Sequence, residues 1–172
     1  GGGYYYPDDE KQGLIDEMQR TRDLGYRLCK MKIGGADLDT DRRRIEWALR
    51  VVGAGDNLAV DANGRFGFEE ALAYGRMAAE FGLCWFEEPV DPLDYRAHAI
   101  LADELDVDIA TGENLFSVQD YRNLLRHGGL RPTSDWLQPD PALEYGLTEC
   151  LEIIELAEVM GWTRARVVPH GG

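Results

Sequence analysis

Three acidic residues at equal spacing carry the clearest chemical signal in this sequence. Asp61, Glu87 and Glu113 follow one another at intervals of 26 positions, and each lies at the C-terminal end of a short apolar run. A strand, a loop, a helix and a second loop together take about 30 residues, so this spacing predicts carboxylates at the tips of three consecutive parallel strands. Three convergent carboxylates form a site for a hard divalent cation, usually Mg2+. The pattern predicts a metal-dependent catalytic site.

Two lysines, Lys30 and Lys32, fall within the apolar run 28–33. Side chains two positions apart on a strand point to the same face, so both lysines face the interior of a barrel if Met31 and Ile33 face its helices. Two ammonium groups held close together beside a divalent cation should have lowered pKa values, which would make a lysine a usable base near neutral pH. Taken alone, the pair is more simply interpreted as two lysines on a solvated strand face.

An aspartate and a histidine near the end of the sequence form a third candidate group. Adjacent strands could place Asp140 beside His170, and a carboxylate bonded to one ring nitrogen fixes the tautomer of an imidazole and raises its basicity. His170 is then expected to act as an acid–base group across the metal from Lys32. His98 and His127 fall within or at the end of predicted helices and are expected to be structural.

Polar residues beside the three acids are expected to support them rather than to bind the cation. Asn63, Glu88 and Asn114 each lie one or two positions after a predicted ligand. Alternation along the strand turns Glu87 inward and leaves Glu88 as its hydrogen-bonding or salt-bridge neighbour. Each acid has a simple structural explanation, such as capping of the helix that follows Asp61. Three acids in phase with the strand–helix period are much harder to explain in that way.

Apolar strand-like runs alternate with helical patterns along the whole sequence. Strands are predicted at 4–6, 28–33, 58–61, 84–87, 107–111, 136–138 and 166–168. Helices are predicted from a cap at Asp8 or Asp9 to about Leu24, and at about 39–52, 68–81, 94–105, 117–127 and 145–160. Seven strands separated by six helices predict an all-parallel sheet. Polar residues at the end of nearly every strand favour a (β/α)8 barrel over a doubly wound sheet.

The length of the chain predicts an incomplete barrel. A barrel of this type has about 250 residues, whereas this chain has 172. Residues 1–172 are therefore interpreted as a partial (β/α) barrel domain that lacks its last strand and helix, with both ends cut rather than capped.

Composition argues against several classes of partner. With 44% hydrophobic and 29% charged residues, the chain is ordinary globular material. The formal net charge of −14 is spread along the sequence, which disfavours nucleic acid and anionic membranes as partners because both are bound through basic patches. No run approaches the roughly 18 apolar residues of a membrane span. Three cysteines without CxxC spacing predict neither a disulfide framework nor a zinc site, and they favour a cytoplasmic location.

Six motifs occur in order along the chain: Lys30-x-Lys32, Asp61-x-Asn63, Glu87-Glu88-Pro89, Gly112-Glu113-Asn114, Asp140 and His170. Together they resemble the mandelate racemase subgroup of the enolase superfamily, and the resemblance covers essentially the whole chain. It implies a Mg2+ ion bound by the three strand-end carboxylates, where the ion holds a substrate carboxylate and stabilises an enediolate. Lys32, with Lys30 beside it, is implied as the base on one face. His170, backed by Asp140, is implied as the group on the other face.

The resemblance also implies a reaction. In members that dehydrate acid sugars the histidine expels the β-hydroxyl as water, and in racemases it returns the proton. Residues 110–117 and 169–172 are similar to those of tartrate dehydratases, so dehydration of tartrate to a 2-keto acid is the favoured expectation. The alternatives are a dehydratase of hexarates or aldonates, a racemase, and a barrel fragment without activity.

The resemblance further implies parts that this chain does not contain. Members of the family carry an N-terminal α+β capping domain whose loops close over the substrate, and they are often oligomers. The full-length protein is accordingly expected to have that domain, to be a homo-oligomer, and to act on a small hydroxy-carboxylate.

Overall fold

The structure of the chain is a computed structural model, and it describes residues 2–171. Within them lie five parallel strands in the order β1-β2-β3-β4-β5. They are β1 (Cys29–Lys32), β2 (Leu58–Asp61), β3 (Phe86–Glu87), β4 (Ile109–Thr111) and β5 (Trp136–Leu137). The helices are α1 (Glu10–Asp23), α2 (Leu38–Val52), α3 (Phe68–Glu80), α4 (Tyr95–Glu104), α5 (Val118–His127) and α6 (Leu147–Val159).

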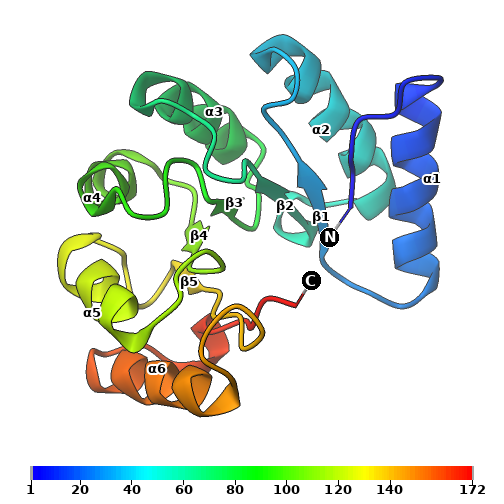
Figure 1. Cartoon of the computed structure of the whole chain (residues 1–172). Coiled ribbons are helices and arrows are strands. Elements are labelled where there is room, and N and C mark those ends of the chain that lie inside the picture. The colour runs from blue at the N-terminus through cyan, green and yellow to red at the C-terminus, as the bar shows by residue number, and fades with distance from the viewer. Residues whose placement is uncertain (1, 172) are drawn as a thin grey trace.

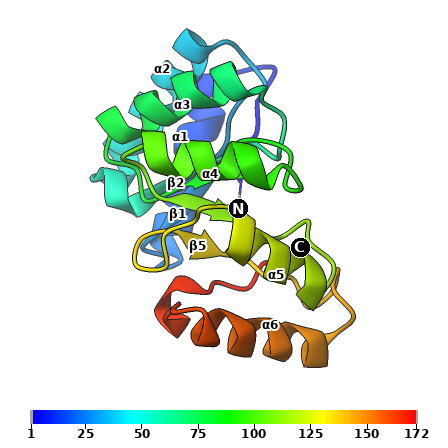
Figure 2. The same cartoon turned by 90° about the vertical axis from the view of Figure 1, so that its left-hand side faces the viewer.

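The strands form the inner wall of an arc and the helices its outer wall, which is the arrangement of a partial (β/α)8 barrel (Figure 1). Seen from the side, α1 to α4 lie on one side of the strands, and α5 and α6 curve round to the other (Figure 2). The predicted fold class is confirmed. The six predicted helices all form within two residues of their expected bounds. None of the helices in residues 2–171 is long and apolar enough to cross a membrane.

The predicted strand over 4–6 is wrong. Gly2 makes a single isolated parallel bridge with Met31 of β1. Gly3 then takes a φ of 64°, which turns the backbone out of the extended conformation, so the segment leaves the edge of the sheet after one bridge.

The predicted strand over 166–168 is also wrong. A short 3-10 turn, Arg164–Arg166, takes up the start of this run. Val167 then makes one isolated parallel bridge with Leu137 of β5. The N–H of His170 still donates to the carbonyl of Pro139, but Pro139 has no N–H with which to complete a second bridge. The expected seven strands therefore become five, although both end segments still lie beside the edge strands.

Side-chain alternation along β1 is the alternation that the sequence predicts. Cys29, Met31 and Ile33 are buried in the main hydrophobic core, together with residues of α1 to α4. The two lysines between them point to the opposite, inner face of the arc. A second core, beneath α5 and α6, is formed by Leu115, Tyr121, Leu124, Leu137, Ile153, Ala157 and Trp162. These outer cores fix which side chains of each strand face the interior.

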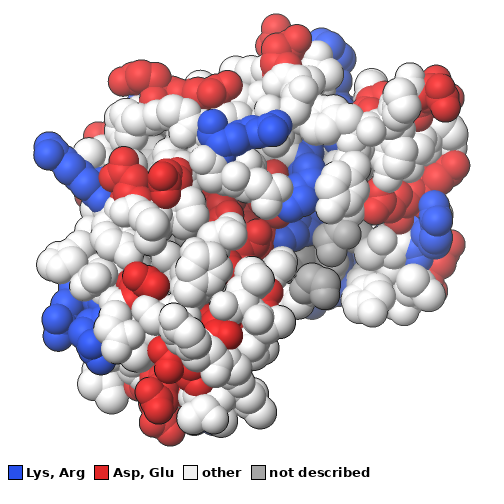
Figure 3. Space-filling view, in the orientation of Figure 1, with Lys and Arg blue, Asp and Glu red and all other residues white. Residues whose placement is uncertain are grey.

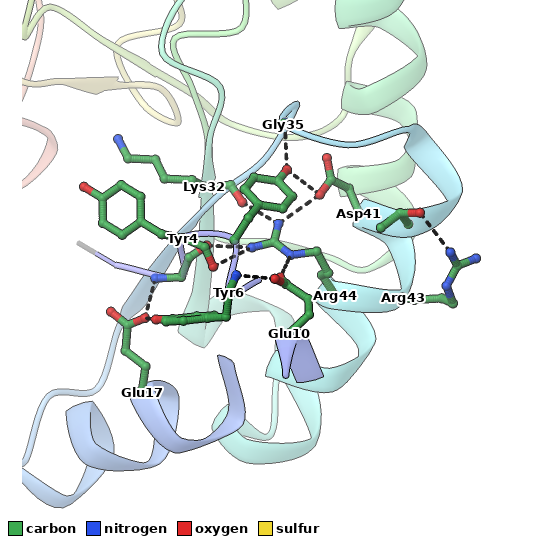
Figure 4. A network of polar contacts seen from close by, with 12 residues as sticks. Tyr4, Tyr6, Glu10, Glu17, Lys32, Gly35, Asp41, Arg43 and Arg44 are labelled. Carbon is green, nitrogen blue, oxygen red and sulfur yellow. Dashed lines mark hydrogen bonds and ion pairs between the residues drawn. The ribbon is translucent and has the colours of Figure 1, made fainter. Parts of the chain in front are cut away.

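A buried network around Arg44 of α2 holds the C-terminal end of β1 (Figure 4). The guanidinium of Arg44 donates to the carbonyl oxygens of Lys32 (2.8 Å) and Gly3 (2.7 Å) and to the carboxylate of Asp41 (2.9 Å). It also lies over the ring of Tyr5, 3.7 Å from the centroid. These contacts tie the N-terminal segment to the strand end that carries Lys32.

The carboxylate of Asp41 extends this network to the loop after β1. It accepts hydrogen bonds from the hydroxyl of Tyr5 (2.7 Å) and from the backbone N–H of Gly34 (2.7 Å). The Tyr5 hydroxyl in turn accepts from the backbone N–H of Gly35 (2.7 Å). The loop that follows Lys32 is thereby held by side chains from both α2 and the N-terminal segment.

Replacing Arg44 with methionine should lower the free energy of unfolding by about 3–5 kcal/mol, because it leaves the buried carboxylate of Asp41 without its cation. Arg42, on the same helix, is the matched control. It pairs with Glu80 at 2.8 Å, but these side chains are 35% and 60% exposed. An exposed pair of this kind contributes roughly 0–1 kcal/mol. Denaturant unfolding measures both variants, and equal losses would contradict the prediction.

Candidate metal and acid–base site

The three predicted carboxylates meet at the C-terminal edge of the sheet. Asp61 ends β2, Glu87 ends β3 beside it in register, and Glu113 follows β4. One oxygen from each lies within 4.8 Å of the others. The three residues are 0%, 0% and 6% exposed. Buried carboxylates at this separation repel one another unless cations pair with them, so the donor set fits a hard divalent cation.

Glu113 reaches this group through a turn that requires glycine. Gly112, directly after β4, has a φ of 130°. A Cβ at this position would lie 2.2 Å from the hydroxyl oxygen of Tyr121. Both the backbone conformation and the close approach exclude a larger residue, which explains why the motif reads Gly-Glu.

Both lysines of β1 face the carboxylates, as predicted, and the interpretation as a solvated strand face is wrong. The Nζ of Lys32 lies 2.5 Å from Oδ2 of Asp61. The Nζ of Lys30 lies 3.3 Å from the same oxygen and also contacts Oε1 of Glu87. The two lysine side chains are 17% and 19% exposed. In the space-filling view, acidic and basic side chains meet in the hollow at the centre of the molecule (Figure 3).

The carboxylates around Lys30 act on its pKa in the opposite direction to the predicted divalent cation and neighbouring ammonium group. Burial does lower the pKa of Lys30, but the contacting carboxylates of Glu87 and Asp61 outweigh it and raise the pKa above its ordinary value. The lowered pKa expected beside a divalent cation stays a prediction.

Asp140 and His170 form the predicted pair. The Nδ1 of His170 lies 2.7 Å from Oδ2 of Asp140, and its Nε2 lies 3.3 Å from Oε2 of Glu113. The backbone places them together, because the N–H of His170 donates to the carbonyl of Pro139 (2.9 Å). Burial raises the pKa of Asp140, but hydrogen bonds from His170 and from two backbone N–H groups lower it overall. An ionised Asp140 beside Nδ1 leaves Nε2 directed at the carboxylates.

The three predicted supporting residues lie beside the carboxylates. The backbone N–H of Asn63 donates to Oδ1 of Asp61 (2.9 Å), and the side chain of Asn114 donates to Oε2 of Glu88 (2.7 Å). Glu88 is fully buried. Burial, followed by the nearby charge of Glu113, raises the pKa of Glu88 to about 8. Glu88 is not among the three carboxylates that converge.

The two remaining histidines lie away from the carboxylates, on helices. His98 is buried in α4, with Nδ1 3.0 Å from the carbonyl oxygen of Asp94, and burial lowers its pKa. His127 ends α5 and is exposed. Both positions agree with the predicted structural roles.

Sequence reasoning missed two neutral donors to Glu87. The indole N–H of Trp85 and the side-chain amide of Gln138 both donate to Oε2 of Glu87, each at 2.8 Å. Trp85 could have been found from the sequence, because it lies two residues before Glu87 in the predicted strand 84–87, and side chains two positions apart on a strand point to the same face. Gln138 follows β5, 51 positions away, and its contact depends on the curvature of the sheet.

A cleft of about 720 Å3 lies between β1 and the C-terminal segment. Its lining includes Lys30, Lys32, Trp85, Gln138 and His170. A small molecule in this cleft therefore has lysines on one side and an imidazole on the other.

The affinity of this site for a divalent cation should fall about tenfold from pH 8 to pH 6, because ligation requires an ionised carboxylate. Burial and the nearby charge of Asp61 raise the pKa of Glu87 to about 7. At a pH above this pKa the carboxylate is already ionised and free to bind. At a pH below it, one proton must leave for each cation bound. Calorimetric titration in buffers of different protonation enthalpy should show release of about one proton at pH 6 and almost none at pH 8. An affinity independent of pH would contradict the prediction.

Comparison with known proteins gives matches along nearly the whole chain. Residues 13–172 match the family described as "Enolase C-terminal domain-like". Arabinonate dehydratase of Saccharolobus solfataricus is 34% identical over 171 residues, which cover 98% of this chain and 43% of that protein. D-galactarolactone cycloisomerase of Agrobacterium fabrum is 34% identical over 162 residues, covering 94% and 41%.

A solved structure agrees with these sequence matches. L-Talarate dehydratase from Polaromonas sp. JS666, complexed with Mg and L-glucarate, superimposes with a TM-score of 0.85 at 31% identity. The match covers 99% of this chain and 46% of that one. The chain therefore spans less than half the length of each of these three relatives.

Proposed function

The chain belongs to the enolase C-terminal domain-like family, and from that premise we propose that its site binds Mg2+ and dehydrates an acid sugar to a 2-keto acid. One observation carries the proposal: three buried carboxylates converge between a pair of lysines and an aspartate–histidine pair. The talarate dehydratase that superimposes on this chain was solved with Mg and an acid sugar, which supports both the ion and the substrate class.

Asp61, Glu87 and Glu113 would hold the ion. When bound there, Mg2+ supplies positive charge that stabilises the enediolate form of a substrate carboxylate. Lys30 contacts two of the three carboxylates, and we assign it the role of balancing their charge beside the base.

Lys32 and His170 divide the proton transfers between the two faces of the substrate. Lys32 takes the proton from the carbon next to the substrate carboxylate as that C–H bond breaks. His170 then donates a proton from Nε2 to the β-hydroxyl, whose C–O bond breaks, and water leaves. The resulting enol rearranges to a 2-keto acid. Asp140 accepts a hydrogen bond from the Nδ1–H of His170 throughout, so the proton that the imidazolium gives up is the second one, on Nε2, which faces the substrate.

The substrate class is an acid sugar with a hydroxyl one carbon beyond the acidic C–H. Within this class we propose tartrate, on the similarity of residues 110–117 and 169–172 to tartrate dehydratases. Since the chain spans less than half of its relatives, we place the activity in a longer polypeptide whose additional domain covers the cleft. The net charge of −14 and the family resemblance favour a cytoplasmic homo-oligomer without nucleic-acid or membrane partners.

A substrate screen tests this proposal. The full polypeptide is incubated with Mg2+ and a library of mono- and diacid sugars, and any 2-keto acid is trapped with semicarbazide. Tartrate should give the signal. Turnover of a different acid sugar would support the proposed dehydration but would show that tartrate is not the substrate. Exchange of the α-proton for deuterium without loss of water would favour a racemase. The absence of both turnover and exchange would contradict the proposal.

A further inference from the structure

We propose that Trp85 and Gln138 hold Glu87 so that only one of its carboxylate oxygens faces the cation, and that they thereby set a preference for Mg2+ over Ca2+. This inference rests on the proposed function, because it takes the cation site as given. Trp85 and Gln138 are positioning residues, because they contact the metal ligand Glu87 and not the ion.

The geometry divides the two oxygens of Glu87 between different partners. Oε2 accepts from the indole N–H of Trp85 and from the side-chain amide of Gln138, each at 2.8 Å. Oε1 contacts the ammonium group of Lys30, which also lies 3.3 Å from Oδ2 of Asp61. Trp85, Gln138 and Glu87 are 5%, 4% and 0% exposed, so water does not readily replace either donor. Oε1 is therefore the oxygen left for a cation.

Glu87 differs in this respect from its neighbour Asp61. One oxygen of Asp61 accepts from the backbone N–H of Asn63 at 2.9 Å, a donor that no side-chain substitution removes. At Glu87 both fixed donors are side chains from separate parts of the chain, Trp85 directly before β3 and Gln138 directly after β5. Substitution of Trp85 or Gln138 can therefore change how many oxygens of Glu87 are free to bind a cation.

Coordination chemistry links that number to the choice of cation. Mg2+ demands near-octahedral geometry at about 2.0–2.1 Å, whereas Ca2+ takes about 6–8 oxygens at 2.3–2.6 Å and accepts two from one carboxylate. A carboxylate that turned Oε2 toward the ion would leave two buried N–H donors without partners, which is unfavourable. The two donors should therefore disfavour the larger ion more than the smaller one.

Packing around Trp85 supplies a matched control. Trp85 and Trp136 lie in one small cluster with Ala59 and Ala110, and the ring centroids of the two indoles are 5.3 Å apart. The indole N–H of Trp136 makes no hydrogen bond to any of the three carboxylates. Exchange of either tryptophan for phenylalanine removes a similar part of the cluster, but only at Trp85 does it remove a donor to Glu87.

The experiment measures the dissociation constants of Mg2+ and Ca2+ by calorimetry in the full chain. The variants are Trp85→Phe, Gln138→Met and Trp136→Phe, each first checked for folding by circular dichroism. In Trp85→Phe and Gln138→Met the ratio of the Ca2+ constant to the Mg2+ constant should fall about tenfold or more, the size of effect that partners of metal ligands usually have. In Trp136→Phe the ratio should stay unchanged. Loosened packing alone would weaken the binding of both ions by the same factor and leave the ratio of their dissociation constants unchanged.

Two outcomes overturn the inference and can be told apart. A ratio unchanged in both Trp85→Phe and Gln138→Met, with Mg2+ still bound by the unmodified chain, overturns this inference and leaves the proposed function standing. Absence of Mg2+ binding by the unmodified chain overturns both. Since Gln138 belongs to neither the tryptophan cluster nor β3, its variant keeps the test decisive if Trp85→Phe fails to fold.

Discussion

Replacing Lys32 with alanine should lower turnover by about 10^2–10^4-fold, the usual contribution of a positioned general base, while Mg2+ still binds. The Nζ of Lys32 lies 2.5 Å from a carboxylate oxygen of Asp61 and borders the cleft, so it is placed to take a proton from a substrate held there. Its removal deletes the base and leaves all three carboxylates in place. Mg2+ affinity should be retained or increased, because a competing positive charge is lost.

The measurement pairs 2-keto acid formation with calorimetric Mg2+ binding on the same preparation. Lys11→Ala is the control, because Lys11 is an exposed lysine on α1. It should leave both quantities unchanged. Loss of Mg2+ binding in Lys32→Ala would contradict the assignment, since it would place Lys32 in the structure of the metal site rather than in proton transfer.

Replacing His170 with asparagine should lower dehydration by a similar factor, about 10^2–10^4-fold, but should leave exchange of the α-proton with solvent deuterium. The reason is the separation of the two groups, because the base on β1 still forms the enediolate while no acid remains to protonate the leaving hydroxyl. Proton exchange followed by nuclear magnetic resonance measures the first step, and trapped 2-keto acid measures the second.

His127→Asn is the control for this variant, because His127 is exposed at the end of α5. It should change neither signal. If His170→Asn abolished exchange together with dehydration while Mg2+ still bound, the division of the two faces between Lys32 and His170 would be wrong.

The positions of the site residues were accessible from the sequence because parallel strands end at one edge. The interval of 26 positions places Asp61, Glu87 and Glu113 in phase with the strand–helix repeat, and the structure brings them within 4.8 Å of one another. Spacing of two residues likewise predicted the common face of the two lysines. These are consequences of local periodicity, which a sequence carries directly.

Properties that depend on distances across the fold were not accessible in this way. Two carboxylates from other strands contact the ammonium group of Lys30 and raise its pKa, and the sequence provides no measure of those distances. Arg44 lies within a predicted amphipathic helix and has an ordinary polar identity, yet its side chain is fully buried. Its burial depends on carbonyl groups supplied by β1 and by the N-terminal segment. The residue pattern of the helix itself does not predict these distant acceptors.

In the proposed mechanism the two ends of the arc serve the two faces of the cleft, and this division has an evolutionary consequence. The lysines lie on β1, whereas the histidine follows the last strand, after Val168. With the roles divided as proposed, mutations in the C-terminal segment would change the fate of the enediolate while leaving its formation intact. A lineage carrying this barrel would then acquire a new reaction by altering one short stretch of chain, without first losing the step of proton removal.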